Sequence, residues 1–312
     1  MQSSGCLRPR SRSHDPSLKI CTTIHEMRTA SRAVRSAGKR LGFVPTMGAL
    51  HEGHLSLVRA ARASCDVVAA SIFVNPTQFG PNEDLAKYPR SFECDRELLE
   101  REGVEVLFAP SVEEMYPAGA VTWVTVEGLS GKLDGRLRPG HFRGVTTVVA
   151  KLFHVIEPDT AFFGQKDAAQ VAIIRRMVRD LNLPVEIVVC PIVREPDGLA
   201  MSSRNAYLDP EQRKRALLLH GSLLHVQRLV DAGEREAAKL VVAGREAFAA
   251  EGSVRLDYFE LVDPDTLDPV EDISGGALAA VAAFVGSTRL IDNILLGKNG
   301  GEPQRQKDFA KA

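Results

Sequence analysis

Residues 41–58 read LGFVPTMGALHEGHLSLV, and this stretch decides the fold class. The run from Leu41 to Val44 is short and apolar, as in a buried strand. A turn at 45–53 follows, and apolar residues from Leu55 onward recur at the spacing of one helix face. The stretch therefore predicts a strand, a turn and a helix in immediate succession, which is the repeating unit of a parallel α/β sheet.

The same unit recurs along the first two thirds of the chain. A capping box of Thr23 and Glu26 begins an earlier helix that ends at Gly38, and residues 122–126 alternate like a strand. The alternation predicts an α/β fold, a Rossmann-like doubly wound parallel sheet with helices on both faces. The other predicted elements are strands at 67–73, 104–109, 160–163 and 185–189 and helices at 91–101, 145–156 and 168–181.

The pattern changes after Val193. Because predicted helices then precede predicted strands, we expect a second, smaller α+β C-terminal domain. The helices are predicted at 210–231 and 234–251 and the strands at 256–262, 278–285 and 289–296. The domain prediction is a disordered extension at 1–17, the sheet domain at 18–192, the smaller domain at 193–297 and a polar tail at 298–312.

Composition limits the classes of function. The 312 residues include 39 Lys and Arg against 40 Asp and Glu, a net charge of −1, so no basic field for nucleic acid is present. No apolar run reaches the roughly 18–20 residues that span a bilayer. We therefore expect no nucleic acid and no membrane as partners. The five cysteines are widely spaced, which favours free thiols in a reducing compartment and a cytoplasmic location.

Two polar segments carry weaker signals. Residues 1–17 are rich in Ser and Arg and lack the apolar core of a secretory signal. An organelle transit peptide has a similar composition and stays open, but Asp15 and the missing amphipathic stripe favour disorder. Residues 75–90 form a loop longer than most strand-to-helix links, and we expect a lid or substrate loop there.

The turn after the first sheet strand has the residues of a phosphate site. Gly48 and Gly53 allow a ligand to approach the backbone, and a helix start offers free N–H groups to phosphate. His51 and His54 are three positions apart, so on a helical turn they share a face and can stabilise a leaving pyrophosphate. A zinc pair is the alternative, but the second histidine comes one residue early for H-E-x-x-H. We predict no metal-binding residues.

The segment FGQKDAAQ at 163–170 again links a strand to a helix, so it should open at the same end of the sheet. Lys166 is a candidate phosphate ligand, and Asp167 could cap the helix or hold a ribose hydroxyl. Gln170 lies one turn further, on the side of Lys166. Taken alone, this segment would be interpreted as a surface lysine beside a helix cap.

Two more segments fit the same picture. In AMSSRN at 200–205, the hydroxyls of Ser202 and Ser203 followed by Arg204 can grip phosphate oxygens, although a serine-rich turn is the simpler alternative. In FVNPTQF at 73–79, the amides of Asn75 and Gln78 follow a strand. A neutral amide can hold a substrate carboxylate without weakening its attack as a nucleophile, whereas an arginine would.

Together these motifs resemble a known family. H-x-G-H after the first strand and M-S-S-R after the sheet are similar to the HIGH/KMSKS nucleotidyl-transferase superfamily. More closely, PTMGALHEGH, FVNPTQF, FFGQKDAAQ and MSSRN, in this order, resemble the pantothenate synthetase (pantoate–β-alanine ligase) family. GHFRGV at 140–145 and TRLIDN at 288–293 also fit that family, and the likeness runs from Leu18 to Leu296.

The resemblance implies a two-step reaction. Pantoate attacks the α-phosphate of ATP to give pantoyl adenylate and pyrophosphate, and β-alanine then displaces AMP to give pantothenate. Adenylation is needed because oxide is a poor leaving group and AMP a good one. The resemblance further implies ATP as a substrate, Mg²⁺ as a cofactor and a homodimer.

It also implies roles for single residues. His54, the expected proton donor, and His51 would contact the phosphates together with Lys166 and the segment from Ser202 to Arg204. Gln78 and Gln170 would hold pantoate, whereas His141 and Arg143 receive no step. The implied ATP-binding residues are Met47, Gly48, Ala49, Leu50, His51, Glu52, Gly53, His54, Gly164, Gln165, Lys166, Asp167, Val193, Met201, Ser202, Ser203 and Arg204.

One departure and two alternatives accompany this interpretation. Ala200 stands where synthetases of the superfamily carry the first lysine of K-M-S-K-S, and Lys166 could supply that charge. The main alternative is another small-molecule nucleotidylyltransferase or adenylate-forming ligase of the superfamily. An RNA-binding module that keeps the fold is the second, and the net charge of −1 argues against it.

Overall fold

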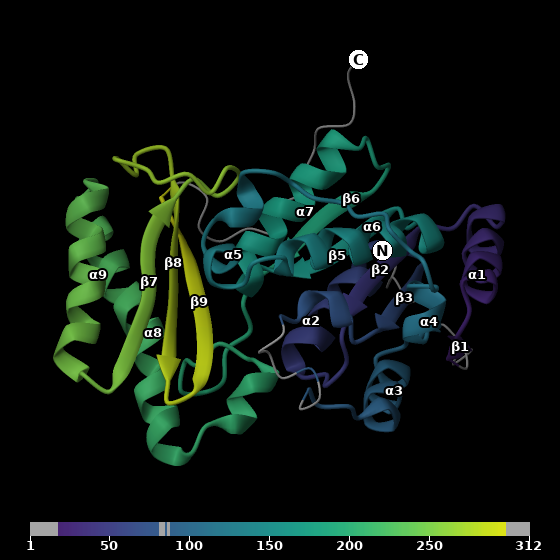
Figure 1. Cartoon of the computed structure of the whole chain (residues 1–312), viewed down its shortest axis with the longest axis horizontal. Coiled ribbons are helices and arrows are strands. Elements are labelled where there is room, and N and C mark those ends of the chain that lie inside the picture. Colours follow the sequence, from purple (N-terminus) through teal and green to yellow (C-terminus); the bar gives the residue numbers. More distant parts are fainter. Residues whose placement is uncertain (1–17, 81–84, 86–87, 298–312) are drawn as a thin grey trace, which may run out of the picture.

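The structure is a computed structural model and describes residues 18–80, 85 and 88–297. The predicted extension at 1–17 and tail at 298–312 lie outside the described residues, as does most of the centre of the predicted lid. In Figure 1 the larger α/β part lies beside a smaller part that contains the C-terminal strands, as the sequence predicts.

The larger part is built on a six-stranded parallel sheet in the order β1-β4-β3-β2-β5-β6. From β2 the chain adds strands first on one side and then, from β5, on the other. The border between β2 and β5 is therefore the topological switch point, where ligands bind in open α/β sheets. The strands are β1 Lys19–Cys21, β2 Leu41–Thr46, β3 Val67–Ile72, β4 Val106–Phe108, β5 Thr160–Gly164 and β6 Glu186–Cys190.

Alternating side chains make this sheet a three-layer structure. In β3, Val67 and Ala69 belong to the core on one face, and Val68 and Ala70 to the core on the other. Helices α1 (Ile24–Ser36), α6 (His141–Ile156) and α7 (Ala168–Asp180) pack on the first face. Helices α2 (Glu52–Ser64) and α3 (Phe92–Arg101) pack on the second. Both faces are covered, which confirms the doubly wound prediction.

Short helices complete the larger part. The α-helical ones are α4 (Val112–Met115) and α5 (Asp134–Leu137). The 3₁₀ turns of this part are η1 (Pro76–Gln78), η3 (Leu129–Gly131) and η4 (Gln165–Asp167). A further turn, η5 (Ser203–Tyr207), comes after β6 and directly before the helices of the smaller part. Strand β1 and helices α4 and α5 were not predicted, because three or four residues are too few to show a periodicity.

The smaller part has an antiparallel sheet in the order β7-β8-β9, formed by Val254–Val262, Ala277–Val285 and Thr288–Leu296. Helices α8 (Pro210–Asp231) and α9 (Ala237–Glu251) pack on one face. The other face, with Tyr258 and Ala280, joins the core of the larger part. Helices before strands confirm the predicted α+β class.

One predicted strand is wrong. Residues 122–126 do not form a strand of the described sheets. The Val124 N–H donates to Thr147 Oγ1 at 3.0 Å, and its carbonyl accepts from Thr146 Oγ1 at 2.6 Å. Side chains of α6 thus satisfy the backbone groups that a neighbouring strand would otherwise have bonded.

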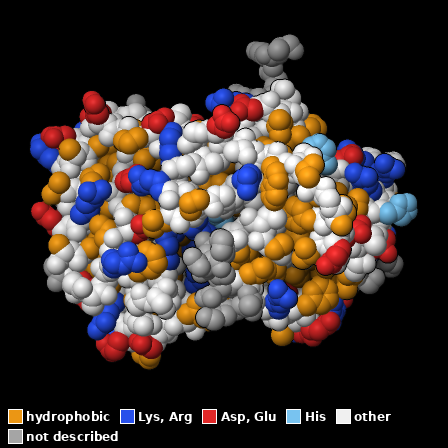
Figure 2. Space-filling model, viewed as in Figure 1, with side chains coloured by type: hydrophobic (Ala, Val, Ile, Leu, Met, Phe, Trp, Pro, Cys, Tyr) orange, Lys and Arg blue, Asp and Glu red, His pale blue; other side chains and the backbone are white. Residues whose placement is uncertain are grey.

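Basic and acidic side chains are interspersed on the face shown in Figure 2, without a broad surface of one sign. On this face, positive and negative side chains therefore lie among one another, in agreement with the near-zero net charge of the chain. Among the described residues, no helix is long and apolar enough to cross a membrane.

Candidate active site

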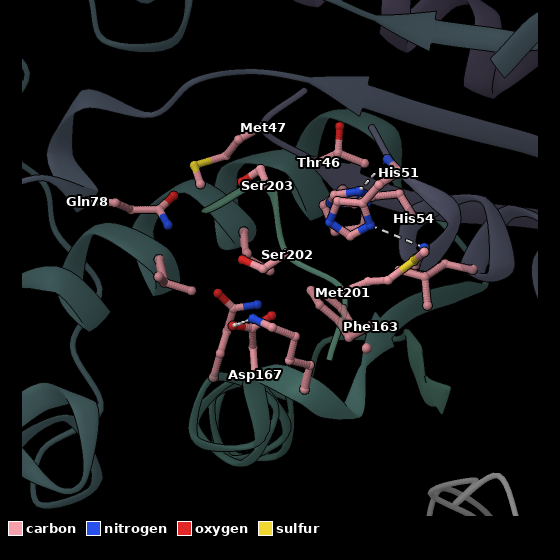
Figure 3. A pocket seen from close by; sticks show the side chains of 18 of the residues that line it. Thr46, Met47, His51, His54, Gln78, Phe163, Asp167, Met201, Ser202 and Ser203 are labelled. Atoms are coloured by element: carbon pink, nitrogen blue, oxygen red, sulfur yellow. Dashed lines mark hydrogen bonds and ion pairs between the residues drawn. The ribbon is translucent and has the colours of Figure 1, made fainter. Parts of the chain in front are cut away.

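A cavity of about 270 Å³ opens at the switch point of the sheet. It lies between the loops after β2, β3, β5 and β6, one face of α6 from His141 to Leu152, and the segment that leads into η5. In Figure 3 the imidazoles of His51 and His54 lie together on one side, and Gln78 points into the same space from the other. The predicted residues that line the cavity are Met47, His51, Gly53, His54, Gln78, Gly164, Lys166, Asp167, Gln170, Val193, Met201, Ser202, Ser203 and Arg204.

The two histidines are held by backbone N–H groups of their own turn. The Gly53 N–H donates to His51 Nδ1 at 3.1 Å, and the His51 N–H donates to His54 Nδ1 at 3.3 Å. A nitrogen that accepts carries no proton, so each neutral ring has its proton on Nε2. A Cβ at residue 53 would lie 2.9 Å from the His51 ring, so a larger residue in place of Gly53 would displace that ring.

Burial keeps both rings neutral. Burial, with a smaller contribution from the neighbouring His51, lowers the pKa of His54 to about 3. The pKa of His51 is lowered by burial and by the nearby Lys166. The ring centroids are 4.2 Å apart, so two imidazolium charges there would repel each other. Each ring therefore offers a hydrogen-bond donor without a net charge.

Asp95, on α3, fixes the loop before the histidines. Its carboxylate accepts from the backbone N–H groups of Ala49 and Leu50, both at 2.8 Å. Ala49 has φ +52°, a left-handed conformation that a non-glycine residue adopts at a cost. Asp95 is 2% exposed. The two hydrogen bonds thus hold a strained turn that sequence reasoning could not connect with a helix more than forty residues away.

Five predicted residues do not line the described cavity. Gly48, Ala49 and Leu50 have their N–H groups bonded to the side chains of Thr46 or Asp95. The Glu52 carboxylate forms an ion pair with Arg59 on the surface of α2. Gln165 turns away and donates to Asn293 Oδ1 at 3.1 Å.

The turn η4 brings Lys166 and Asp167 to the cavity from β5. The Lys166 side chain is 20% exposed, and its Nζ is 4.0 Å from Asp167 Oδ1. Arg138 and Arg204 also line the cavity, whereas Asp167 is the single acidic side chain among its described lining residues. A cavity with this excess of cations suits a polyanion.

Gln78 is oriented by the buried Asn75, which does not itself line the described cavity. Asn75 Nδ2 donates to Gln78 Oε1 at 2.9 Å and to the Gly144 carbonyl at 3.1 Å. Because the Gln78 oxygen already accepts a bond, its Nε2 donors face the cavity, as suits a carboxylate or hydroxyl.

His141, at the start of α6, is held in place by Arg138 and by the backbone of Gln78. Its Nε2 lies 3.0 Å from Arg138 Nη1, and its Nδ1 lies 2.8 Å from the Gln78 carbonyl. A guanidinium only donates, so Nε2 accepts and Nδ1–H donates. Arg143 points elsewhere and stacks on Trp123 at 4.8 Å.

The M-S-S-R segment closes the cavity from the side of the smaller part. Ser202 caps η5 by accepting from the Arg204 N–H at 3.3 Å. Tyr88 meets Ser203: burial raises the pKa of the Tyr88 phenol, and a hydrogen bond to Ser203 partly offsets this. Tyr88 lies in the predicted lid or substrate loop at 75–90 but was not singled out there, and Arg138 belongs to no predicted motif; both line the cavity.

A polar cavity at the switch point of a doubly wound sheet, with imidazoles and cations at the carboxyl ends of strands, defines a nucleotide-binding α/β enzyme. The matching family model, for pantoate-beta-alanine ligase, covers residues 19–295. The chain belongs to this family and is a ligase.

Similar proteins agree with this membership. The pantothenate synthetase of Acidobacterium capsulatum is 64% identical, over 90% of this chain and 98% of its own. That of Koribacter versatilis is 61% identical, over 91% and 97%. The crystal structure of pantothenate synthetase from Thermus thermophilus superposes with a TM-score of 0.84 at 50% identity, covering 88% of this chain and 98% of that one.

A further solved relative contains ligands. The pantoate-beta-alanine ligase of Francisella tularensis, complexed with beta-gamma ATP and beta-alanine, has a TM-score of 0.72 and 33% identity. The similarity covers 89% of this chain and 98% of that one.

Proposed function

We propose that the protein condenses pantoate with β-alanine, using ATP, and releases pantothenate, AMP and pyrophosphate through a pantoyl-adenylate intermediate. Family membership and the ligand-bound Francisella tularensis relative support this. The observation that carries the proposal is the cavity itself. Imidazole and ammonium groups after β2 and β5, which suit phosphate, line the same space as the amide donors of Gln78.

The imidazoles would act as neutral donors. In our proposal, Nε2–H of His51 and of His54 donates to the phosphate oxygens of ATP. Negative charge grows on the pyrophosphate as the α-phosphate is transferred, so donors fixed in advance stabilise the transition state more than the ground state. Lys166 supplies the positive charge at the same oxygens. Because the low pKa of His54 leaves its ring neutral, His54 can act as a proton donor only if contact with the phosphates raises that pKa and the ring becomes protonated.

Gln78 and Gln170 would hold pantoate. Both line the cavity, and Gln78 presents N–H donors to it because its oxygen is bonded to Asn75. A neutral donor orients the attacking carboxylate and leaves its charge available for attack. Val193 and Met201 would line the adenine side, and Ser202, Ser203 and Arg204 would close over the phosphates.

Mg²⁺ fits this site as a companion of ATP. The described residues contain no cluster of three acidic, His or Cys side chains that could hold a metal ion. Mg²⁺ is commonly bound by one or two carboxylates plus substrate phosphates, and Asp167 is the carboxylate that the cavity offers. When bound, the ion neutralises phosphate charge.

Three wider expectations belong to the same proposal. We expect a homodimer, as the family resemblance implies, and sedimentation at several concentrations tests it. We expect a cytoplasmic location, supported by the free cysteines Cys21, Cys65, Cys94 and Cys190. We also propose the domain division at 192–193, which limited proteolysis tests.

Isotope exchange tests the reaction. Labelled pyrophosphate should exchange into ATP only when pantoate is present, and full turnover should release AMP and pyrophosphate. Exchange without pantoate would indicate a different nucleotidylyltransferase of the superfamily. Release of ADP and phosphate would exclude the adenylate route.

A further inference from the structure

The segment TRLIDN at 288–293 lies on β9 of the smaller part, and two of its residues reach the loops of the site. Successive side chains of a strand point to opposite faces. Asp292 and Asn293 therefore contact different partners, and both are buried. In Figure 1, β9 is the strand of the smaller sheet that lies toward the larger part.

Asn293 holds the turn that carries Lys166. Its Nδ2 donates to the carbonyls of Gln165 at 3.0 Å and Lys166 at 2.9 Å, and its Oδ1 accepts from Gln165 Nε2 at 3.1 Å. Carbonyl oxygens only accept, so the amide has one possible orientation. Each of these bonds crosses from the smaller part to the larger one.

Asp292 holds the segment on the other side of the site. Its carboxylate makes a bidentate ion pair with Arg194 at 2.7 and 2.9 Å. Arg194 begins a turn that pairs with Ala200, directly before Met201. The same strand thus fixes both the Lys166 turn and the turn that leads to the M-S-S-R segment.

We propose that Asn293 is a positioning residue for adenylation: it sets the place of Lys166 at the phosphates of ATP by fixing the Gln165–Lys166 backbone from the smaller part. The inference rests on the proposed function of Lys166. Asn293 does not line the described cavity, so it acts through Lys166. A displacement of about 1 Å at a reacting group costs on the order of 10²-fold in rate.

The first test is the variant Asn293→Asp. The new carboxylate has the same size, but it faces two carbonyl oxygens that it repels. We expect kcat for pantoate-dependent exchange of pyrophosphate into ATP to fall by about 10–100-fold. Asn293→Ala, which removes the bonds without repulsion, should reduce kcat less. The alanine variant also keeps the test valid if the aspartate variant does not fold.

Ile294→Ala is the matched control. Ile294 is the next residue on β9 and packs against the core of the smaller part, so its loss weakens the same strand on its other face. It should lower the midpoint of thermal unfolding and leave kcat unchanged. If both Asn293 variants lower kcat no more than Ile294→Ala does, the inference is wrong.

A double-mutant cycle separates positioning from general destabilisation. If Asn293 acts through Lys166, Asn293→Asp should have little further effect on exchange in a Lys166→Ala background. Fully multiplicative losses would overturn the inference. Absence of exchange in the unaltered protein would instead overturn the proposed function.

Discussion

The histidines of the H-x-G-H turn have their protonation state determined by the backbone around them. Two N–H groups of the turn occupy the Nδ1 atoms of His51 and His54, and burial excludes a second proton. The pair therefore acts through oriented Nε2–H donors. Sequence spacing predicted that the rings share a face, but it could not reveal the tautomer, which depends on a helix cap formed by the histidine itself.

Replacing His54 by Ala should remove one donor that acts in the transition state. We expect kcat for exchange to fall by roughly 10²–10³-fold, the range for loss of one such donor. His154→Ala, an exposed histidine of α6, is the control and should keep full activity. An unchanged kcat in His54→Ala would remove the histidine from the mechanism.

The lowered pKa of His54 also predicts a pH dependence of stability. Its pKa is 6.5 in an unfolded chain and about 3 in the folded protein. The unfolded form thus takes up a proton that the folded form refuses, so this contribution to the free energy of unfolding is present above pH 6.5 and lost as the pH falls toward 3. Urea unfolding at pH 7.5, 5.5 and 4.5 measures it. His54→Gln should lose less stability over this range, and parallel curves for the two proteins would contradict the prediction.

Asp95→Asn should damage the loop without touching the cavity. An amide has one acceptor oxygen, so one of the N–H groups of Ala49 and Leu50 would lose its partner, at about 1–3 kcal/mol of stability. We expect a lower kcat as well, because the histidines follow this turn. Asp263→Asn is the control for loss of the charge alone, because in this turn after β7 two backbone N–H groups donate to a single oxygen, which the amide keeps. Equal kcat in the two variants would show that Asp95 has no effect on the site.

At the scale of elements, the sequence was sufficient wherever a pattern was long. The capping box of Thr23 and Glu26 is present as predicted, and the apolar runs of β2, β3 and β5 mark the sheet. The sequence did not predict the structure around Val124. The alternating pattern there is typical of a strand, but the backbone N–H and carbonyl of Val124 are bonded to side chains of α6, which are distant in the sequence. The order of the strands in the sheet could not be predicted either, because it depends on contacts between residues that are far apart in the sequence.

Gly144 marks a close contact between two such elements. A Cβ there would lie 2.3 Å from the Thr77 carbonyl, so α6 and η1 would have to separate. Gly144→Ala should destabilise the protein by about 1–3 kcal/mol or more and disturb Gln78. Gly221→Ala, in α8 with no atom within 4 Å of the new Cβ, should instead stabilise by about 0.5–1 kcal/mol. Opposite shifts of the urea midpoint are expected, and similar shifts would contradict this packing.

At the scale of the molecule, the two parts share buried charges that no motif predicted. Arg289 on β9 binds Asp134 of α5 at 2.8 Å and Asp257 of β7 at 2.8 Å, and all three side chains are largely buried. The sequence could predict each part from its own pattern. It could not predict their contact, because an interface of single residues has no periodicity.

Arg289→Ala should leave two buried carboxylates without their shared cation. We expect a loss of about 3–5 kcal/mol, because removing one partner of a buried pair strands the other. Arg176→Ala, which breaks an exposed pair on α7, should cost at most about 0.5 kcal/mol. Urea unfolding followed by fluorescence compares the two variants. Equal losses in the free energy of unfolding would show that the buried cluster stabilises the protein no more than an exposed ion pair does.

The position of the site between β2 and β5 has a consequence for folding kinetics. These strands are adjacent in the sheet, yet β3, α3, β4 and α6 come between them along the chain. Closing so long a loop costs chain entropy before the contacts between β2 and β5 can form and compensate for it. Topologies of this kind therefore fold slowly. A chain still emerging from a ribosome would form β2, α2 and β3 before β5, and these elements carry His51 and His54 but not Lys166. We therefore expect binding competence to appear late and abruptly, when β5 inserts beside β2.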